Sequence, residues 1–394
     1  MRSRGNRGAA RALLAAAALA AAGLLSLSCS KPGPEAGQKG EEPLRIAIAF
    51  DVGGRGDGAF NDSAYAGLVQ VAKAYGGKIV GDPDRVDHGG KIELRYLESK
   101  LGGQDREQLL RVLSEEGNRL VFGVGFMFAE SIARVAKDFP NVHYALVDGV
   151  VPDLAEGSNV TCLGFAEEEG SFLVGALSGL AVADKPGAKV GFIGGMDTPL
   201  IHRFQAGFQA GAAYANPRLR KPGMILGQYI GRDGSAFNDP KTAAAIASTM
   251  YKGGAEIVYH AAGGSGAGLF EAAAAAGKLA VGVDSDQGYS LMTDAKDPAA
   301  RELGERVLTS MLKRVDQAVF LTAKELVESG KVRGGYRTFS LADDGVGVAK
   351  NEFNSGRLAP YEAELDALKA RIVAGAIKVP ADAEAAAAFV KGLK

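Results

Sequence analysis

Residues 44–62 read LRIAIAFDVGGRGDGAFND and contain the first half of an α/β unit. Residues 44–52 form an almost continuous apolar run, which is the pattern of a strand covered on both faces of a sheet. A glycine-rich segment, residues 53–58, separates this run from residues 63–75, whose apolar side chains recur at helical spacing. A strand, a glycine-rich turn and an amphipathic helix in this order predict a parallel α/β sheet.

The same alternation continues along the chain. Further apolar runs, most of which end in Gly or Asp, are predicted to be buried strands: 92–98, 120–126, 142–148, 160–165, 189–194, 224–230, 257–260 and 279–284. Amphipathic helical stretches lie between them. About nine or ten strands exceed one comfortable sheet, so the sequence predicts an α/β protein with two doubly wound, Rossmann-like lobes of similar topology.

The predicted lobes use separate parts of the chain. Lobe 1 is predicted to contain residues 44–162 and a return segment around 290–318. Lobe 2 is predicted to contain residues 163–289 and a return segment around 319–350. Residues 351–394 are predicted to form a C-terminal helical segment. The stretch 298–329 is predicted to be helical and to cross back to lobe 1.

The composition excludes several classes of protein. The 394 residues contain 45 Lys and Arg against 46 Asp and Glu, and 47% of the residues are hydrophobic. Such a chain is too apolar and too evenly charged to be disordered, and it lacks an electrostatic footprint for nucleic acid. Two cysteines cannot form a disulfide framework, and the four histidines show no metal-ligand spacing. We therefore expect neither a metal ion nor a nucleic-acid partner.

The first 28 residues have the features of an export signal. Four arginines precede an apolar run, residues 12–27, which is shorter than the roughly 20 residues of a membrane span. Cys29 follows this run directly, and a polar tether extends to residue 43. The arrangement resembles the lipobox of bacterial lipoproteins, in which the cysteine is acylated, although Ser26 replaces the usual Leu. We expect removal of residues 1–28 and a lipid on Cys29; the alternative is cleavage nearby and a protein without an anchor.

Carboxylates, phenylalanines and glycines follow the predicted strands. Ligands of parallel α/β sheets bind outside the carboxyl ends of the strands, so these residues are candidates for a binding site. In chain order they are Asp51, Asp57, Phe60, Asn61, Asp148, Phe237, Gly263 and Asp284. Rings can stack on a flat ligand, carboxylates accept hydrogen bonds from vicinal hydroxyls, and glycines allow close backbone approach. The pattern predicts a neutral, flat ligand that carries hydroxyl groups.

Each of these residues also has an ordinary structural interpretation. A single ring is more often part of a hydrophobic core, and a single acid is more often a turn or helix-cap residue. Asn61 or Asp62 would then cap the helix that follows the first loop. The recurrence of the same residue types at consecutive strand ends favours the binding interpretation.

The enzyme motifs suggested by the glycine-rich segments are incomplete. Residues 191–195 (GFIGG) follow a strand but lack the spacing of a dinucleotide fingerprint. Residues 263–268 (GGSGAG) contain no Lys-Ser or Lys-Thr pair of a phosphate loop. Ser265 does not lie in a G-x-S-x-G elbow because Ala267 occupies the last position. We expect no cofactor and no catalysis.

Several long motifs in the same order resemble the basic membrane protein family, the nucleoside-binding lipoproteins of bacterial ABC importers. They are D-V-G-G-R-G-D-G-A-F-N (51–61), F-Q-A-G-F-Q-A-G (204–211), V-Y-H-A-A-G-G-S-G-A-G-L-F (258–270), G-V-D-S-D-Q (282–287) and L-T-S-M-L-K-R-V-D-Q-A-V (308–319). The resemblance covers about residues 44–350. It implies the type I periplasmic-binding fold, in which two hinged lobes close on a ligand.

The resemblance implies that two aromatic rings sandwich a purine. The first ring would be Phe60. By motif position the second ring would be Phe237, with Phe204 as the competing choice.

The resemblance also implies polar contacts to the ligand. Asp284 would hold ribose hydroxyls, and Lys313 would reach the same region. Asp51 and Asp148 would line the edges of the sugar and the base.

By this resemblance, the protein would be the substrate-binding lipoprotein of an ABC importer. It would capture purine nucleosides and deliver them to a membrane permease that works with an ATPase. We expect a monomer anchored in the cell envelope by its acyl group. Two alternatives stay open: an exported ligand-sensing receptor of the same fold, and a nucleoside hydrolase.

Overall fold

The computed structural model describes residues 42–100, 102–155, 157–294 and 298–393. The predicted export signal and Cys29 lie outside these ranges. Within them, no helix has both the length and the apolar character needed to cross a membrane.

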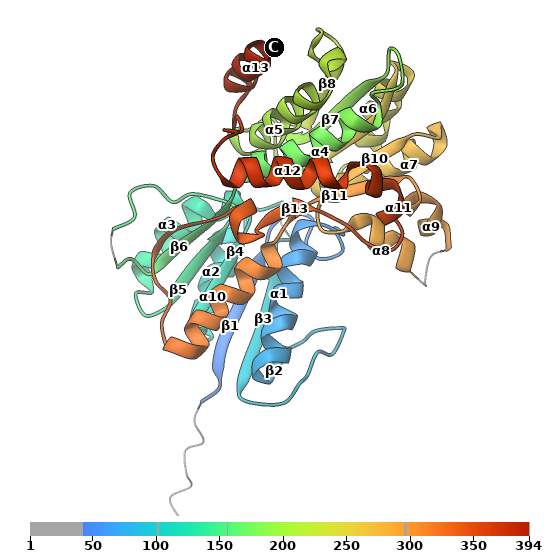
Figure 1. Ribbon diagram of the computed structural model, residues 1–394. Coiled ribbons are helices and arrows are strands. Elements are labelled where there is room, and N and C mark those ends of the chain that lie inside the picture. Colours follow the sequence, from blue (N-terminus) through green and yellow to red (C-terminus); the bar gives the residue numbers. More distant parts are fainter. Residues whose placement is uncertain (1–41, 101, 156, 295–297, 394) are drawn as a thin grey trace, which may run out of the picture. The chain divides into compact units, whose positions relative to one another are not determined.

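Two mostly parallel sheets, flanked by helices, confirm the predicted α/β fold with two lobes (Figure 1). The seven-stranded sheet of lobe 1 has the order β12-β6-β5-β4-β1-β3-β2. Its strands are β1 (Leu44–Phe50), β2 (Gly77–Ile79), β3 (Ile92–Glu98), β4 (Leu120–Val124), β5 (His143–Val147), β6 (Val160–Phe165) and β12 (Gly335–Phe339). The six-stranded sheet of lobe 2 has the order β13-β11-β10-β9-β7-β8, with β13 antiparallel to β11. Its strands are β7 (Lys189–Met196), β8 (Ile225–Gly231), β9 (Ala255–Ala261), β10 (Leu279–Asp284), β11 (Val307–Lys313) and β13 (Val346–Val348).

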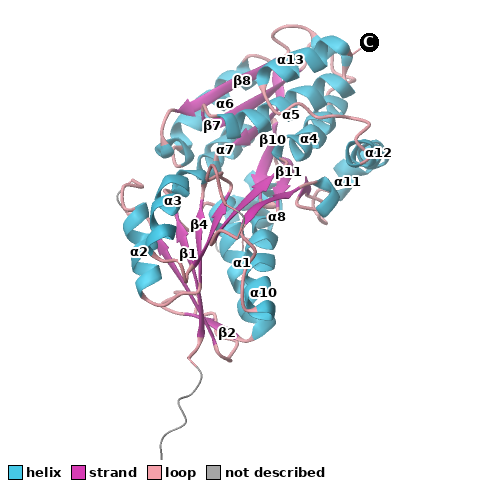
Figure 2. Ribbon diagram, turned by 90° about the vertical axis from the view of Figure 1, so that its left-hand side faces the viewer, coloured by secondary structure: helices cyan, strands magenta, loops and turns pink. Residues whose placement is uncertain are grey.

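Helices cover the sheets of both lobes (Figure 2). Those of lobe 1 are α1 (Phe60–Tyr75), α2 (Arg106–Glu115), α3 (Ala129–Asp138) and α10 (Val315–Ser329). Those of lobe 2 are α4 (Glu167–Ala181), α5 (Pro199–Ala215), α6 (Pro240–Lys252), α7 (Gly266–Ala276), α8 (Gln287–Thr293) and α9 (Pro298–Gly304). The C-terminal helices are α11 (Ser355–Leu358), α12 (Glu362–Val373) and α13 (Ala383–Gly392). Helix α12 packs on α4, and α13 packs on α5, so the C-terminal segment covers lobe 2.

The burial of β1 explains its uninterrupted apolar sequence. Ile46, Ile48 and Phe50 belong to one hydrophobic cluster, which also contains residues of α1 and α10. Ala47 and Ala49 belong to a second cluster on the other side of the sheet, together with residues of α2 and α3. Full burial of an Ile or Phe side chain stabilises the fold by about 1.5–3 kcal/mol. Because helices cover both faces, neither set of side chains needs to be polar.

The structure corrects the path of the chain between the lobes. The chain crosses after β6, after β11, and again between β12 and β13. Most of each predicted return segment lies in the other lobe, because β11 belongs to the sheet of lobe 2 whereas β12 pairs with β6 in lobe 1. The predicted lobe holds only at the ends, for the start of α10 in lobe 1 and for β13 in lobe 2. The predicted division between residues 162 and 163 falls inside β6, and the first crossing follows Phe165.

The prediction of helix throughout residues 298–329 was also wrong. Residues 307–313 (VLTSMLK) form β11, which pairs with β10 on one side and β13 on the other. This strand is buried on both faces, so its sequence lacks the polar–apolar alternation of a half-exposed strand. Leu, Met and Lys are also good helix formers, and periodicity cannot separate the two structures in so short a run.

Candidate ligand-binding site

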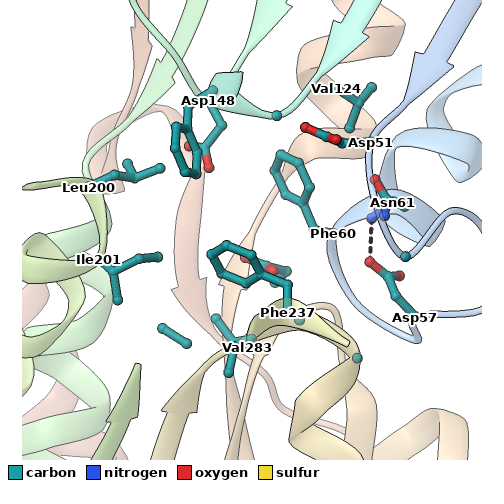
Figure 3. A pocket seen from close by; sticks show the side chains of 18 of the residues that line it. Asp51, Asp57, Phe60, Asn61, Val124, Asp148, Leu200, Ile201, Phe237 and Val283 are labelled. Carbon is teal, nitrogen blue, oxygen red and sulfur yellow. Dashed lines mark hydrogen bonds between the residues drawn. The ribbon is translucent and has the colours of Figure 1, made fainter. Parts of the chain in front are cut away.

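A cavity lies where the carboxyl ends of strands from both sheets meet (Figure 3). It contains about 710 Å³ of empty space, part of which is open to solvent. All nine candidates from the sequence line this cavity: Asp51, Asp57, Phe60, Asn61, Asp148, Phe237, Gly263, Asp284 and Lys313. The eight residues chosen from strand ends, and Lys313 from the family resemblance, thus lie around one cavity. Their contact with a ligand stays a prediction.

Aromatic and aliphatic side chains form much of the cavity wall. Phe60 and Phe237 project into the cavity, and Leu200 and Ile201 of α5 face it from the other side (Figure 3). Both rings are only partly buried. Gly195 makes room for the second ring, because a Cβ atom there would lie 2.5 Å from the Phe237 side chain.

Phe204 also lines the cavity, but in a different setting. It is 3% exposed, and its ring centroid lies 5.2 Å from the ammonium group of Lys313. The ring is thus part of the packed wall behind the lysine.

The first loop is held in shape by its own acids. The Asp57 carboxylate accepts hydrogen bonds from the backbone N–H groups of Ala59, Asn61 and Asp62 at 2.9–3.1 Å. Asp57 therefore satisfies the start of α1, where the sequence suggested Asn61 or Asp62 as the cap; Asp62 instead accepts from the N–H groups of Gly56 and Gly58. Burial raises the pKa of Asp57 to about 6, although the backbone N–H groups oppose this shift.

Asn61, the second residue of α1, is buried and lines the cavity. Its side-chain Oδ1 atom has no hydrogen-bond partner within the described part of the chain. A buried acceptor without a partner costs free energy, so a ligand that donates a hydrogen bond here would be favoured.

Asp51 is paired with a cation that the sequence analysis missed. Nε of Arg106 lies 2.9 Å from both carboxylate oxygens of Asp51, and Nη2 lies 2.6 Å from Oδ1. Arg106 begins α2, far from Asp51 in the sequence. The nearby residue that fits this position of Arg106 is Gly103, because a Cβ atom there would lie 2.1 Å from the guanidinium group. The pair neutralises one of the acids in the cavity wall.

Lys313, the last residue of β11, is the one cation among the described residues that line the cavity. It is 1% exposed, forms an ion pair with Asp148, and lies 3.2 Å from Oε1 of Glu167. Three phenylalanine rings surround its ammonium group, with centroids 5.1–5.3 Å away: Phe60, Phe165 and Phe204. Burial alone would lower the pKa of Lys313, but the surrounding carboxylates raise it, so the group stays charged.

Asp148 and Asp284 occupy corresponding places in the two lobes. Asp148 directly follows β5 and Asp284 ends β10, and each of these strands is third from the same end of its sheet. Both have left-handed backbones, with φ of 67° and 66°. Such outliers cost on the order of 1–3 kcal/mol and cluster at functional sites. Burial raises the pKa of Asp284 to about 7, which Lys313 opposes and Asp148 reinforces.

Metal-ligand geometry is missing from the described residues, since no group of three His, Cys, Asp or Glu side chains there could hold an ion. The arrangement instead offers stacking surfaces, hydrogen-bond acceptors and one fixed ammonium group, which together can bind an organic ligand.

Comparisons with known proteins agree with this geometry. A family model described as "ABC transporter substrate-binding protein PnrA-like" matches residues 45–383. The chain is 32% identical to the CD4+ T-cell-stimulating antigen of Listeria monocytogenes, over 87% of this chain and 89% of that protein. It is 29% identical to basic membrane protein A of Borreliella burgdorferi, over 93% and 96%. A solved solute-binding protein of an ABC transporter system from Aeropyrum pernix superposes with a TM-score of 0.71 at 26% identity, over 89% and 97% of the two chains.

Proposed function

Because the chain belongs to the PnrA-like Bmp family of ABC transporter substrate-binding proteins, we propose that it captures purine nucleosides between its two lobes and delivers them to a membrane permease. The observation that carries the proposal is the composition of the cavity. Phe60 and Phe237, both partly exposed, project into it, and Lys313, the one cation among the described lining residues, is already paired with Asp148. Membership of the family implies a solute ligand and partner permease and ATPase subunits.

The two rings would hold the purine by stacking, which contributes about 1–3 kcal/mol per base in nucleic-acid complexes. Phe60 is the ring from lobe 1. Phe237 is the better partner from lobe 2 because it is only partly buried, whereas Phe204 packs behind Lys313.

The ribose would lie near Asp284 and Lys313, whose ammonium group is 5.3 Å from the centroid of the Phe60 ring. A carboxylate accepts hydrogen bonds from vicinal hydroxyls, and an ammonium group donates to their oxygens. Asp51 and Asn61 would face the remaining edges of the ligand. Asp57 would act mainly by shaping the loop, since three backbone N–H groups already use its carboxylate.

Nucleosides are expected to bind far more tightly than the matching monophosphates. The cavity is lined by Asp51, Asp57, Asp148 and Asp284, so a phosphate would be buried beside carboxylates without a free cation. Isothermal titration of the mature protein with inosine, adenosine, guanosine, the free bases, ribose and the 5′-monophosphates tests this. Equal or tighter binding of a monophosphate would contradict the site assignment.

The same titrations distinguish capture from catalysis. Chromatography of the ligand after incubation should recover intact nucleoside. Release of the free base would instead support the hydrolase alternative.

The N-terminal anchor predicts an extracytoplasmic, membrane-attached protein, as the name of the related basic membrane proteins suggests. Cys29→Ala should move the protein from the membrane fraction to the soluble fraction, because the variant lacks the acylated thiol. Fractionation of cells that express the wild type and the variant, with immunoblotting, measures the change. Ser30→Ala is the matched control and should stay with the membrane. If the Cys29 variant partitions like the wild type, the anchor lies elsewhere while the binding fold is unaffected.

A further inference from the structure

Glu167 is a buried carboxylate that the proposed ligand contacts do not use. It is the first residue of α4, directly after the first crossing between the lobes, and it is 1% exposed. Its Oε1 lies 3.2 Å from Nζ of Lys313, and its Oε2 lies 2.8 Å from Nε of Arg203. Among the described residues, neither oxygen has a contact with hydrogen-bond geometry. Glu167 therefore interacts with its neighbours through charge rather than through directed hydrogen bonds.

Arg203 extends this contact to the wall of the cavity. It lies on α5, which also supplies Leu200, Ile201 and Phe204 to the lining. Its Nη2 lies 2.7 Å from Oε2 of Glu168 and donates to the backbone carbonyl of Phe165 at 3.1 Å. A continuous set of charges thus runs from Lys313 in the cavity, through Glu167 at the crossing, to Arg203 on α5.

Two of the three crossings meet at this set of charges. Glu167 follows the crossing after β6, and Lys313 immediately precedes the crossing from β11 to α10. The ring of Phe165 stacks on that of Phe339, which precedes the third crossing, with centroids 5.5 Å apart. Lys313 and Glu167 thus lie beside the segments that join the lobes.

Stability alone does not explain why Glu167, Lys313 and Arg203 are buried together. Breaking or mispairing a buried charge is expensive, and hydrophobic residues often replace buried ion pairs without loss. Burial raises the pKa of Glu167 to about 8, and the charge of Lys313 opposes that shift. Packing alone therefore does not account for a carboxylate at position 167.

We infer that Glu167 and Arg203 are positioning residues, which hold the ammonium group of Lys313 in place for the sugar of the ligand without touching the ligand themselves. The inference rests on the proposed function, because it takes Lys313 as a sugar contact.

The test compares ribonucleosides with their 2′,3′-dideoxy analogues. Glu167→Gln keeps the shape of the side chain but removes the charge that Glu167 carries above its raised pKa of about 8. At pH 8.5 it should therefore weaken binding of inosine, adenosine or guanosine by about tenfold or more, the effect of one hydrogen bond to a charged group. Binding of the dideoxy analogues, which lack the sugar hydroxyls, should change by less than about twofold. Isothermal titration gives both ratios.

Three further variants sharpen the comparison. Glu168→Gln removes a carboxylate that contacts Arg203 but not Lys313, so its effect should be smaller than that of Glu167→Gln. Arg203→Lys keeps the positive charge and should retain most of the affinity that Arg203→Met loses. Equal weakening of ribo- and dideoxynucleosides by Glu167→Gln would overturn the inference, because it indicates a purely structural role.

A ligand-free measurement separates this inference from the proposed function. The charged and titratable groups facing Glu167 are Lys313, Asp148, Arg203 and, more distantly, Tyr259. Since the folded pKa of Glu167 lies above that of an unfolded glutamate, wild-type stability falls as pH rises from about 5 to 8. Gln does not titrate, so the unfolding temperature of Glu167→Gln minus that of the wild type should rise over this range.

The unfolding measurement and the nucleoside titration test different claims, so either claim can be contradicted without the other. With Lys313→Met in both proteins the ammonium group no longer opposes the shift, so the same temperature difference should go on rising above pH 8. A difference that levels off at the same pH with and without Lys313 would overturn the charge link between Glu167 and Lys313 even if nucleosides bind. A levelling-off that moves to higher pH in a protein that binds no nucleoside would overturn the proposed ligand and leave that link standing.

Discussion

Lys313→Met should lower the free energy of unfolding of the unliganded protein by about 3–5 kcal/mol at pH 8, which is the usual cost of removing one partner from a buried ion pair. Methionine fills nearly the same space and suits the three surrounding phenylalanine rings, so packing alone would not produce this loss. The loss comes from Asp148, Glu167 and Asp284, which are left buried without the ammonium group. Urea denaturation followed by circular dichroism measures it.

The pH dependence of this loss identifies its cause. As pH falls from 8 to 5, the carboxylates left without Lys313 take up protons, so the difference between variant and wild type should shrink. Lys324→Met is the matched control: Lys324 lies on α10 with 43% of its side chain exposed and is 3.9 Å from Glu328, and its substitution should change stability by less than about 0.5 kcal/mol. A loss for Lys313→Met that is equally large at pH 5 and pH 8 would indicate a packing defect instead.

Asp284→Asn should change binding and stability in opposite directions. Ribonucleosides should lose about 1.5–3 kcal/mol of binding free energy for each hydrogen bond to the carboxylate, whereas 2′,3′-dideoxynucleosides should lose much less. The unliganded variant should be more stable than the wild type above pH 7. Burial raises the pKa of Asp284 from 3.8 to about 7. As pH rises between these two values, the unfolded state ionises before the folded state, so the stability of the wild type falls. The full loss is reached above pH 7.

Asparagine suits this test because it tolerates the left-handed backbone at position 284 almost as well as aspartate. Titration calorimetry and thermal unfolding between pH 5 and pH 9 supply the two measurements. Asp366→Asn, on an exposed part of α12, is the control and should alter neither. If Asp284→Asn weakens ribo- and dideoxynucleosides equally, the sugar contact lies on another residue.

Part of the lining of the cavity could be predicted from the sequence, because those residues stand at the ends of recognisable strands. Asp51, Asp148 and Asp284 directly follow or end apolar runs, and the carboxyl ends of parallel strands point to a common edge. Selecting residues in this way requires only that each strand be recognised in the sequence, and the three strands that these acids follow or end were all predicted.

The ion-pair partners and the crossings could not be predicted in this way. Arg106 is unremarkable in its own segment and gains its role only when folding brings it to Asp51. Glu167 stands in a run of three glutamates at the start of a helix, which is the usual composition of an exposed first turn. Strand β11 is buried on both faces and so has no distinctive period, which hid the crossing that follows it.

The three crossings have a consequence for how the protein is made. Strand β12 completes the edge of the first sheet by pairing with β6, and Gly335 pairs with Thr161. During synthesis, the lobe that begins first must therefore wait, with a strand edge unpaired, until the other lobe has been almost entirely produced. Long-range pairing of this kind slows folding, and an open edge is a template for aggregation. Lobe 2 is then completed later still, by β13, α12 and α13. Neither lobe therefore corresponds to a contiguous gene fragment that could be produced alone.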